Sequence, residues 1–409
     1  MVPEISMPVD EDAVRDIVES CLASETALEI IGAGTKRSLG RPMAAKQILT
    51  TRALSGISLY EPAELVLRAH AGTLLSHLQA ILEKEGQQLA FEPPDLGPLL
   101  GGDADSGTIG GVVASNLAGP RRFRAGAARD HLLGARVVTG RAEVIKTGGR
   151  VVKNVTGYDL CKLLTGSYGT LGVLTEVTLK VLPAPEKTRT LLVFGLDAQA
   201  AQTAMATALN SPHDISGAAY LPEAVAMRSG VGYVADAGGS VTAFRLEGPE
   251  PSVIARGAAV RALMAGQGSV EELHYHNSKN FWDEVGRAAA FAHETDTPVW
   301  RVSLPPADMA RVMAAIGARG LTEYYADWGG GLIWIRVGAK LEDAGTAVIR
   351  DAIAPCGGHA TLIRASNAMR SRVPVFQPAP PGLAALSARI KHGFDPHHIL
   401  NRGRMVDGV

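Results

Sequence analysis

The chain has 409 residues, of which 46% are hydrophobic and 20% charged, and its 40 basic and 41 acidic side chains nearly cancel. This length predicts two domains that each bury a core, and the composition is typical of a folded globular protein. Because the charge is balanced and no basic block is present, we expect no nucleic-acid partner.

The N-terminal residues lack the basic and apolar regions of a signal peptide, and no apolar stretch has the length of a transmembrane helix. The chain has three isolated cysteines, Cys21, Cys161 and Cys356. They indicate a reducing, cytoplasmic location and cannot supply the close-set ligands of an iron–sulfur cluster.

The first half of the chain mixes strands and helices without a regular βαβ order, which favours an α+β fold. Apolar runs predict strands over residues 28–31, 66–71, 135–139 and 173–181. Helical spacing predicts helices over residues 10–23 and 74–85. Pro183 and Pro185 interrupt the pattern, so residues 1–186 are expected to form the first domain.

Residues 187–380 are predicted to form a second domain, a ferredoxin-like α+β cap in which helices back an antiparallel sheet. Its expected helices cover residues 198–209 and 307–318, and two of its expected strands cover residues 299–304 and 332–337. Prolines between 374 and 381 mark a further break. Residues 381–409 then supply a helix over 383–391 and a tail, and no internal repeat is visible in the sequence.

Three glycine-rich segments carry the functional argument: residues 31–36 (loop 1), 106–116 (loop 2) and 166–174 (loop 3). In such turns successive backbone N–H groups point at an anion, and glycine permits close approach or a positive φ. Loop 1 is not a Rossmann fingerprint, because Arg37 occupies the place of the third glycine and no acidic residue follows at the required distance.

In their order, the three loops resemble the FAD-binding domain of the vanillyl-alcohol oxidase / para-cresol methylhydroxylase (PCMH) family. The resemblance covers residues 1–186 and implies a two-subdomain domain to which the C-terminal tail returns. It implies that loop 1 holds the FAD pyrophosphate, that loop 2 runs towards the flavin ring, and that loop 3 contacts adenine and ribose. The cofactor-binding residues implied in this way are Ile31, Gly32, Ala33, Gly34, Thr35, Lys36, Pro94, Gly107, Thr108, Ile109, Gly110, Gly111, Ser115, Asn116, Gly126, Arg129, Asp130, Gly169, Leu171, Gly172, Val173 and Asn401.

Residues 116–122, 126–130, 148–159, 326–330 and 394–396 are similar to the E subunits of bacterial glycolate oxidases. This resemblance implies a complex with a second FAD subunit and an iron–sulfur subunit, which oxidises a small 2-hydroxy acid and meets the membrane only peripherally. Members of the wider family with covalent FAD carry a histidine in loop 1, or add a cysteine in loop 2. Thr35 stands at the first place and residues 106–116 contain no cysteine, so noncovalent FAD is expected.

The substrate site is less well defined. Related D-2-hydroxy-acid dehydrogenases bind a metal with a motif of the form His-x-Gly-Asp-Gly-Asn-x-His, whereas residues 327–334 keep the glycines and lack every histidine. We therefore expect no metal. His274 and His276 alternate on an expected strand, and a polar surface is the preferred interpretation over a metal site.

Candidate catalytic residues are Lys153, Tyr158, Arg301 and His293, and Arg336 and Arg364 are further carboxylate-binding candidates. Three functions stay open: a flavoprotein subunit of a glycolate oxidase, a standalone FAD-dependent hydroxy-acid or sugar-acid dehydrogenase, and a structural subunit whose FAD does not turn over.

Overall fold

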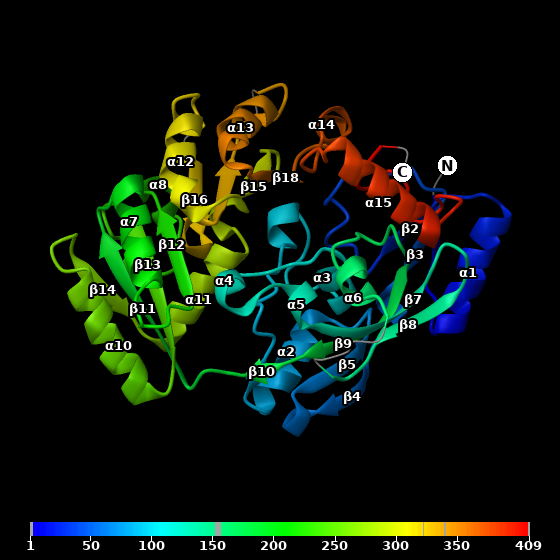
Figure 1. The fold of residues 1–409 in the computed structure, drawn as a ribbon, viewed down its shortest axis with the longest axis horizontal. Coiled ribbons are helices and arrows are strands. Elements are labelled where there is room, and N and C mark those ends of the chain that lie inside the picture. The colour runs from blue at the N-terminus through cyan, green and yellow to red at the C-terminus, as the bar shows by residue number, and fades with distance from the viewer. Residues whose placement is uncertain (1–2, 152–156, 322, 339–340, 408–409) are drawn as a thin grey trace. The chain divides into compact units, whose positions relative to one another are not determined.

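The computed structural model describes residues 3–151, 157–321, 323–338 and 341–407, and the chain divides into two compact units (Figure 1). Unit 1 comprises Met1–Ala118, Gly126–Ala184 and Pro378–Val409, and unit 2 comprises Gly119–Ala125 and Pro185–Gln377. Helices and antiparallel sheets are mixed in the chain, which confirms the predicted α+β class. The domain limits taken from the sequence remain predictions. The sequence did not predict that Gly119–Ala125 would belong to unit 2.

Unit 1 contains two main sheets and a two-stranded ribbon. A parallel sheet has the order β1-β3-β2, an antiparallel sheet has the order β4-β5-β9-β7-β8, and the ribbon pairs β10 with β6. Their bounds are β1 (Glu4–Ser6), β2 (Leu28–Ile31), β3 (Gln47–Thr50), β4 (Ile57–Glu61), β5 (Val66–His70), β6 (Gln87–Gln88), β7 (Leu132–Val138), β8 (Val144–Gly148), β9 (Val173–Lys180) and β10 (Leu182–Pro183). Loop 1 follows β2, and loop 3 leads into β9, as the sequence predicted.

The first helix of unit 1 shows how the sequence specifies the small parallel sheet. The side chain of Asp10 accepts from the N–H of Ala13 and so caps α1, and Val14 and Val18 pack in a core that includes Leu28 of β2 and Leu400 of the tail. The helices of unit 1 are α1 (Glu11–Ala23), α2 (Leu75–Lys84), α3 (Ile109–Ala114), α5 (Ala128–His131), α6 (Leu160–Leu164) and α15 (Pro381–Phe394), with short 3-10 turns at Thr51–Ala53, Pro62–Glu64 and Pro98–Leu100.

Unit 2 contains an eight-stranded antiparallel sheet in the order β14-β11-β13-β12-β16-β17-β15-β18. The chain order β11-α7-β12-β13-α10-β14 is repeated as β15-α12-β16-β17-α13-β18, and both halves have the ferredoxin-like strand order. Tyr220 of β12 pairs with Ala326 of β16 and joins them. The strands are β11 (Lys187–Phe194), β12 (Gly217–Leu221), β13 (Val241–Gly248), β14 (Val270–Leu273), β15 (Val299–Ser303), β16 (Glu323–Asp327), β17 (Leu332–Arg336) and β18 (His359–Arg364).

The predicted ferredoxin-like cap is therefore confirmed but is duplicated, and the duplication was not visible in the sequence. Apolar residues recur in both halves without being identical, because many apolar side chains satisfy the same core positions.

The two faces of this sheet are covered differently. Apolar side chains of the four repeat helices pack with one sheet face in a single core, whereas α11 brings Trp282 to Arg245 on the other face. The helices of unit 2 are α4 (Arg122–Ala125), α7 (Ala198–Leu209), α8 (Glu223–Ala226), α9 (Gly232–Ala235), α10 (Glu250–Leu263), α11 (Tyr275–Gly286), α12 (Met309–Gly317), α13 (Thr346–Ile353) and α14 (Asn367–Arg372), with 3-10 turns at Ala289–Phe291, Pro306–Asp308, Trp328–Gly330 and Ala354–Cys356.

The strand expected at His274 and His276 is wrong. β14 ends at Leu273, His274 is the N-cap residue of α11, and His276 lies in the helix. Across the described ranges, no helix combines the length and apolar character needed to cross a membrane.

Candidate functional site

The three glycine loops of unit 1 meet around one cavity of about 800 Å³, a volume that includes its open mouth. The predicted residues that line it are Ile31, Gly32, Ala33, Gly34, Thr35, Lys36, Thr108, Gly110, Gly111, Ser115, Gly169, Gly172 and Asn401. Segments far apart in the sequence thus converge as the loop order predicted.

Loop 2 is not a loop over most of its length, which corrects the sequence interpretation. Residues Ile109–Ala114 form α3, whose N-terminus is capped by Thr108, since its Oγ1 accepts from Gly111 N at 3.3 Å. The two glycines at 110 and 111 did not predict a helix because glycine has a low helix propensity. Tertiary packing overrides that preference here.

Two glycines of the cavity wall are required by packing between chain segments. A Cβ on Gly32 would lie 2.2 Å from Thr108 Oγ1, and a Cβ on Gly110 would lie 2.7 Å from the carbonyl oxygen of Ala71. Gly110 also donates its N–H to that carbonyl at 2.8 Å. The glycines therefore seat loop 1 on α3 and α3 on the end of β5, and this seating leaves the backbone at the cavity surface.

Lys36 is one of the cations of the cavity wall, beside Arg37 and Arg404. Its Nζ lies 3.1 Å from the position that a Cβ on Gly107 would take. Burial lowers the pKa of the Lys36 ammonium, and Asp95 opposes that shift. Within the described parts of the chain this ammonium has no hydrogen-bond or ion-pair partner. An anion bound in the cavity would therefore supply a negative partner for its positive charge.

Asn401, in the tail, links β2 just before loop 1 to Tyr168 of loop 3. Its Oδ1 accepts from Ile30 N at 2.8 Å, and its Nδ2 donates to Tyr168 O at 2.6 Å. Arg404 adds a second tie, because it donates to the carbonyls of Arg37 and Leu39 and forms an ion pair with Glu29 at 2.9 Å. The tail thus lines the cavity and links the segments around loops 1 and 3.

A buried ion pair holds the tail itself in place. Lys391 of α15 donates to Asp395 Oδ2 at 2.6 Å, to Thr170 O in loop 3 at 2.8 Å and to Leu400 O at 2.9 Å. Asp395 accepts in turn from the N–H groups of Ile399 and Leu400. Both charged groups are fully buried and fully hydrogen-bonded, which is the condition under which such a pair is tolerated.

Nine predicted cofactor residues do not line the cavity: Pro94, Gly107, Ile109, Asn116, Gly126, Arg129, Asp130, Leu171 and Val173. Ile109 and Val173 are core residues, and Asn116 accepts from Arg129 N at 3.1 Å. Contacts of these nine with FAD remain predictions. The cavity also includes residues that were not predicted: Ile30, Arg37, Leu39, Thr51, Ala71, Ala114, Ser167, Tyr168, Leu174 and Arg404. The sequence signal that could have indicated Arg404 is its position three residues after Asn401, which was predicted to contact FAD.

The candidate catalytic residues are less well organised. Lys153 lies outside the described residues, Tyr158 in unit 1 is 93% exposed, and His293 in unit 2 is exposed. The Arg301 guanidinium lies over the ring of Trp328 at 4.8 Å. Each of these side chains keeps its role only as a prediction.

The other two cap arginines have structural partners. Arg336 forms ion pairs with Glu294 and Glu323, and Arg364 donates to Phe291 O and Thr297 O. In the residues described, no group of three His, Cys, Asp or Glu side chains is placed to hold a metal.

Comparison with known proteins gives relatives that match over nearly the whole chain. Residues 4–148 match the family described as "FAD binding domain". The glycolate oxidase subunit GlcE of Escherichia coli (strain K12) is 35% identical over 393 residues, which is 96% of this chain and 96% of the relative. The glycolate oxidase subunit GlcD of Bacillus subtilis (strain 168) is 32% identical over 206 residues, 50% of this chain and 42% of the relative.

Solved structures share the fold at low sequence identity. The 4-ethylphenol oxidase from Gulosibacter chungangensis has a TM-score of 0.73 at 15% identity and covers 98% of this chain and 88% of its own. A p-cresol methylhydroxylase with substrate bound has a TM-score of 0.69, also at 15% identity, with coverage of 98% and 88%. The expected PCMH-type fold is confirmed, and the domain that surrounds the cavity binds FAD.

Proposed function

The chain belongs to the family of the glycolate oxidase subunit GlcE, and we propose that it is the FAD-carrying subunit of a complex that oxidises glycolate to glyoxylate. The convergence of the three glycine loops on one cavity carries this proposal, because it gives the flavin a site within this chain. Bound FAD would accept the two electrons and the hydrogen that leave the alcohol carbon of the substrate.

The residues of the cavity fit FAD in charge and shape. The Lys36 ammonium, which has no hydrogen-bond or ion-pair partner among the described residues, suits a pyrophosphate, and the glycine-rich backbone of loop 1, which lines the same cavity, suits the same anion. Asn401 and Arg404 would keep loops 1 and 3 at the spacing that the cofactor requires.

We further propose that FAD is held without a covalent bond. Thr35 is at the cavity wall where a histidine would be needed, and no cysteine lines the cavity in the described residues. The test is precipitation of the yellow holoprotein with trichloroacetic acid. All flavin absorbance should pass to the supernatant, and flavin retained in the washed pellet would contradict the noncovalent site.

The cap would supply the substrate contacts. Arg301, with its guanidinium on the face of Trp328, is the proposed ligand of the substrate carboxylate, and Lys153, Tyr158 and His293 are the proposed candidates for proton transfer. The histidines of the metal-assisted dehydrogenases have no counterpart in residues 327–334. For this reason we propose that turnover requires the partner subunits.

The proposed partners are a second FAD subunit and an iron–sulfur subunit, which would carry electrons onward. The three cysteines of this chain are scattered, so a cluster would have to belong to another chain. The complex would be cytoplasmic and would reach the inner face of the cell membrane through its partners.

The decisive experiment compares the purified chain with the co-expressed complex under anaerobic conditions. Glycolate is added, and the absorbance of the oxidised flavin at its visible maximum is followed over time. We expect no bleaching of the isolated chain and rapid bleaching of both flavins in the complex. Rapid bleaching of the isolated chain would establish the standalone dehydrogenase instead. If only one flavin of the complex bleaches, and Arg301→Met does not slow it, this chain is a structural subunit.

A further inference from the structure

Between Ala118 and Gly126 the chain leaves unit 1, and the seven residues Gly119–Ala125 pack into unit 2. The residues of unit 1 that flank this excursion are hydrogen-bonded to each other. Ala128 N donates to Leu117 O at 3.1 Å, and Arg129 N donates to Asn116 Oδ1 at 3.1 Å. Asn116 is the last residue of loop 2, and the residues 115–118 connect the end of α3 to the excursion.

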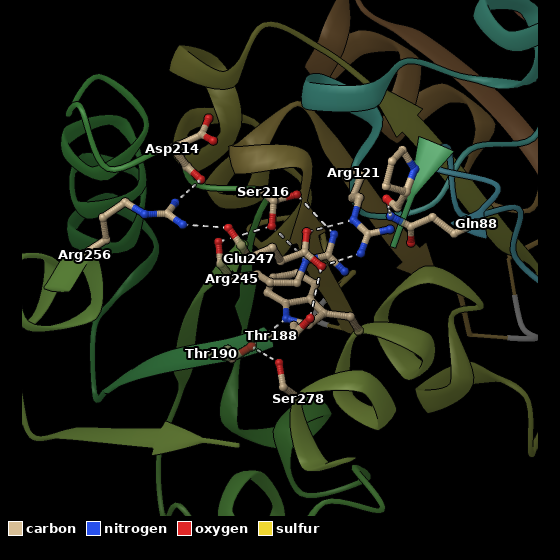
Figure 2. Close-up of polar contacts among 12 residues, drawn as sticks. Gln88, Arg121, Thr188, Thr190, Asp214, Ser216, Arg245, Glu247, Arg256 and Ser278 are labelled. Atoms are coloured by element: carbon tan, nitrogen blue, oxygen red, sulfur yellow. Dashed lines mark hydrogen bonds and ion pairs between the residues drawn. The ribbon is translucent and has the colours of Figure 1, made fainter. Parts of the chain in front are cut away.

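Arg121 makes the principal attachment of the excursion to the unit 2 sheet. It forms a bidentate ion pair with Glu247 of β13, with Nε 2.8 Å from Oε2, and the two side chains are only 11% and 10% exposed (Figure 2). Arg245 approaches the same carboxylate, with its Nε 3.7 Å from Glu247 Oε2. Ser216 holds Arg245 through its carbonyl at 3.1 Å, and the ring of Trp282 packs against the guanidinium at 4.8 Å.

Further contacts hold the N-terminal end of the excursion. Trp328 Nε1 donates to Gly119 O at 3.0 Å, and Pro120 packs so closely on Gly286 that a Cβ there would lie 2.9 Å away. The sequence motifs at 116–122 and 326–330 therefore meet in one contact. Arg124 also pairs with Asp214 at 2.6 Å, but both side chains are more than half exposed, so this pair contributes little.

We propose that Arg121 is a positioning residue for the FAD site: its ion pair with Glu247 fixes Gly119–Ala125 to the unit 2 sheet and thereby restrains α3 and Asn116. This inference rests on the proposed placement of FAD against α3. The physical reason is that a segment ordered before binding does not have to lose its conformational freedom when the ligand arrives. No atom of Arg121 needs to touch the cofactor.

The test uses Arg121→Met, which keeps the side-chain stem but removes the guanidinium, and leaves Glu247 facing Arg245. Arg121→Lys is the conservative variant, and a lysine restores the charge without the bidentate geometry. The matched control is Arg189→Met, which breaks the Arg189–Glu272 pair at 2.7 Å on the same sheet, between β11 and β14. Hydrogen exchange is measured on the apoprotein, and FAD affinity is measured by flavin fluorescence.

We expect Arg121→Met to speed amide exchange in residues 106–118 while β11 and β13 keep their protection, and to raise the FAD dissociation constant about tenfold. Arg121→Lys should recover part of both effects, and Arg189→Met should show neither. Exchange in residues 106–118 equal to that of Arg189→Met would overturn the proposal. Faster exchange with unchanged FAD affinity would overturn the claim that Arg121 positions the FAD site, and with it the placement of FAD against α3. This outcome does not depend on which substrate the complex oxidises.

Discussion

The FAD cavity of unit 1 and the polar face of the unit 2 sheet are stabilised in different ways. At the cavity of unit 1, glycines seat one backbone segment on another, and the tail donates mainly to carbonyl oxygens. The sheet face of unit 2 is held by side-chain charges, with Arg121, Glu247 and Arg245 in one cluster and Arg228, Glu323 and Arg336 in another. A backbone site depends on a few glycines at fixed positions, whereas a side-chain site depends on pairings between distant strands.

The largest expected effect tests whether the tail supports the unit 1 cavity. Lys391→Met leaves the Asp395 carboxylate fully buried without its cation, so unit 1 should lose about 3–5 kcal/mol of unfolding free energy. Urea unfolding of the apoprotein measures this loss. The control is Lys391→Met combined with Asp395→Leu, which removes both charges and should recover part of the stability. A single variant as stable as the parent would show that the tail is not required.

The next effect tests the claim that backbone packing forms the cofactor site. Gly110→Ala places a Cβ 2.7 Å from the Ala71 carbonyl, and neither backbone can yield without moving α3. FAD affinity should fall about 100-fold, near 2.7 kcal/mol. The control is Gly382→Ala, at which a Cβ meets no atom within 4 Å. Equal FAD affinity in the two variants, measured by titration of the apoprotein, would contradict the backbone account.

The same contrast explains what the sequence predicted. Loop 1 after β2 and the helix α1 were predicted because each depends on local pattern, whereas the return of the tail with Asn401 was implied by the resemblance to the PCMH family. The helix α3 was missed because its glycines satisfy a tertiary contact. Arg121–Glu247 was also missed, since the two residues are 126 positions apart and no local pattern records the pairing.

A smaller effect tests the charged cluster of Arg121, Glu247 and Arg245 in unit 2. Burial alone would raise the pKa of Glu247, but Arg245 and Arg121 lower it to about 2. Because the folded-state pKa is lowered, its stabilising contribution is complete above about pH 4.5 and is lost as the pH falls towards 2. The stability difference between the parent and Glu247→Gln should therefore be constant, at about 2 kcal/mol, near neutral pH and shrink below pH 4.5. Urea unfolding across this range measures it, and a pH-independent difference would contradict the charged role.

The smallest effect concerns Tyr158, which belongs neither to the cavity wall of unit 1 nor to the charged clusters of unit 2. Tyr158 is 93% exposed, so Tyr158→Phe should change unfolding free energy by less than about 0.5 kcal/mol and should leave FAD affinity unchanged. Its hydroxyl can then act only on a substrate or on a partner subunit. Turnover of the complex at saturating glycolate separates these roles from assembly measured by gel filtration. A fall in turnover with intact assembly would assign the hydroxyl to chemistry, because a contact that only holds subunits together would lower assembly as well.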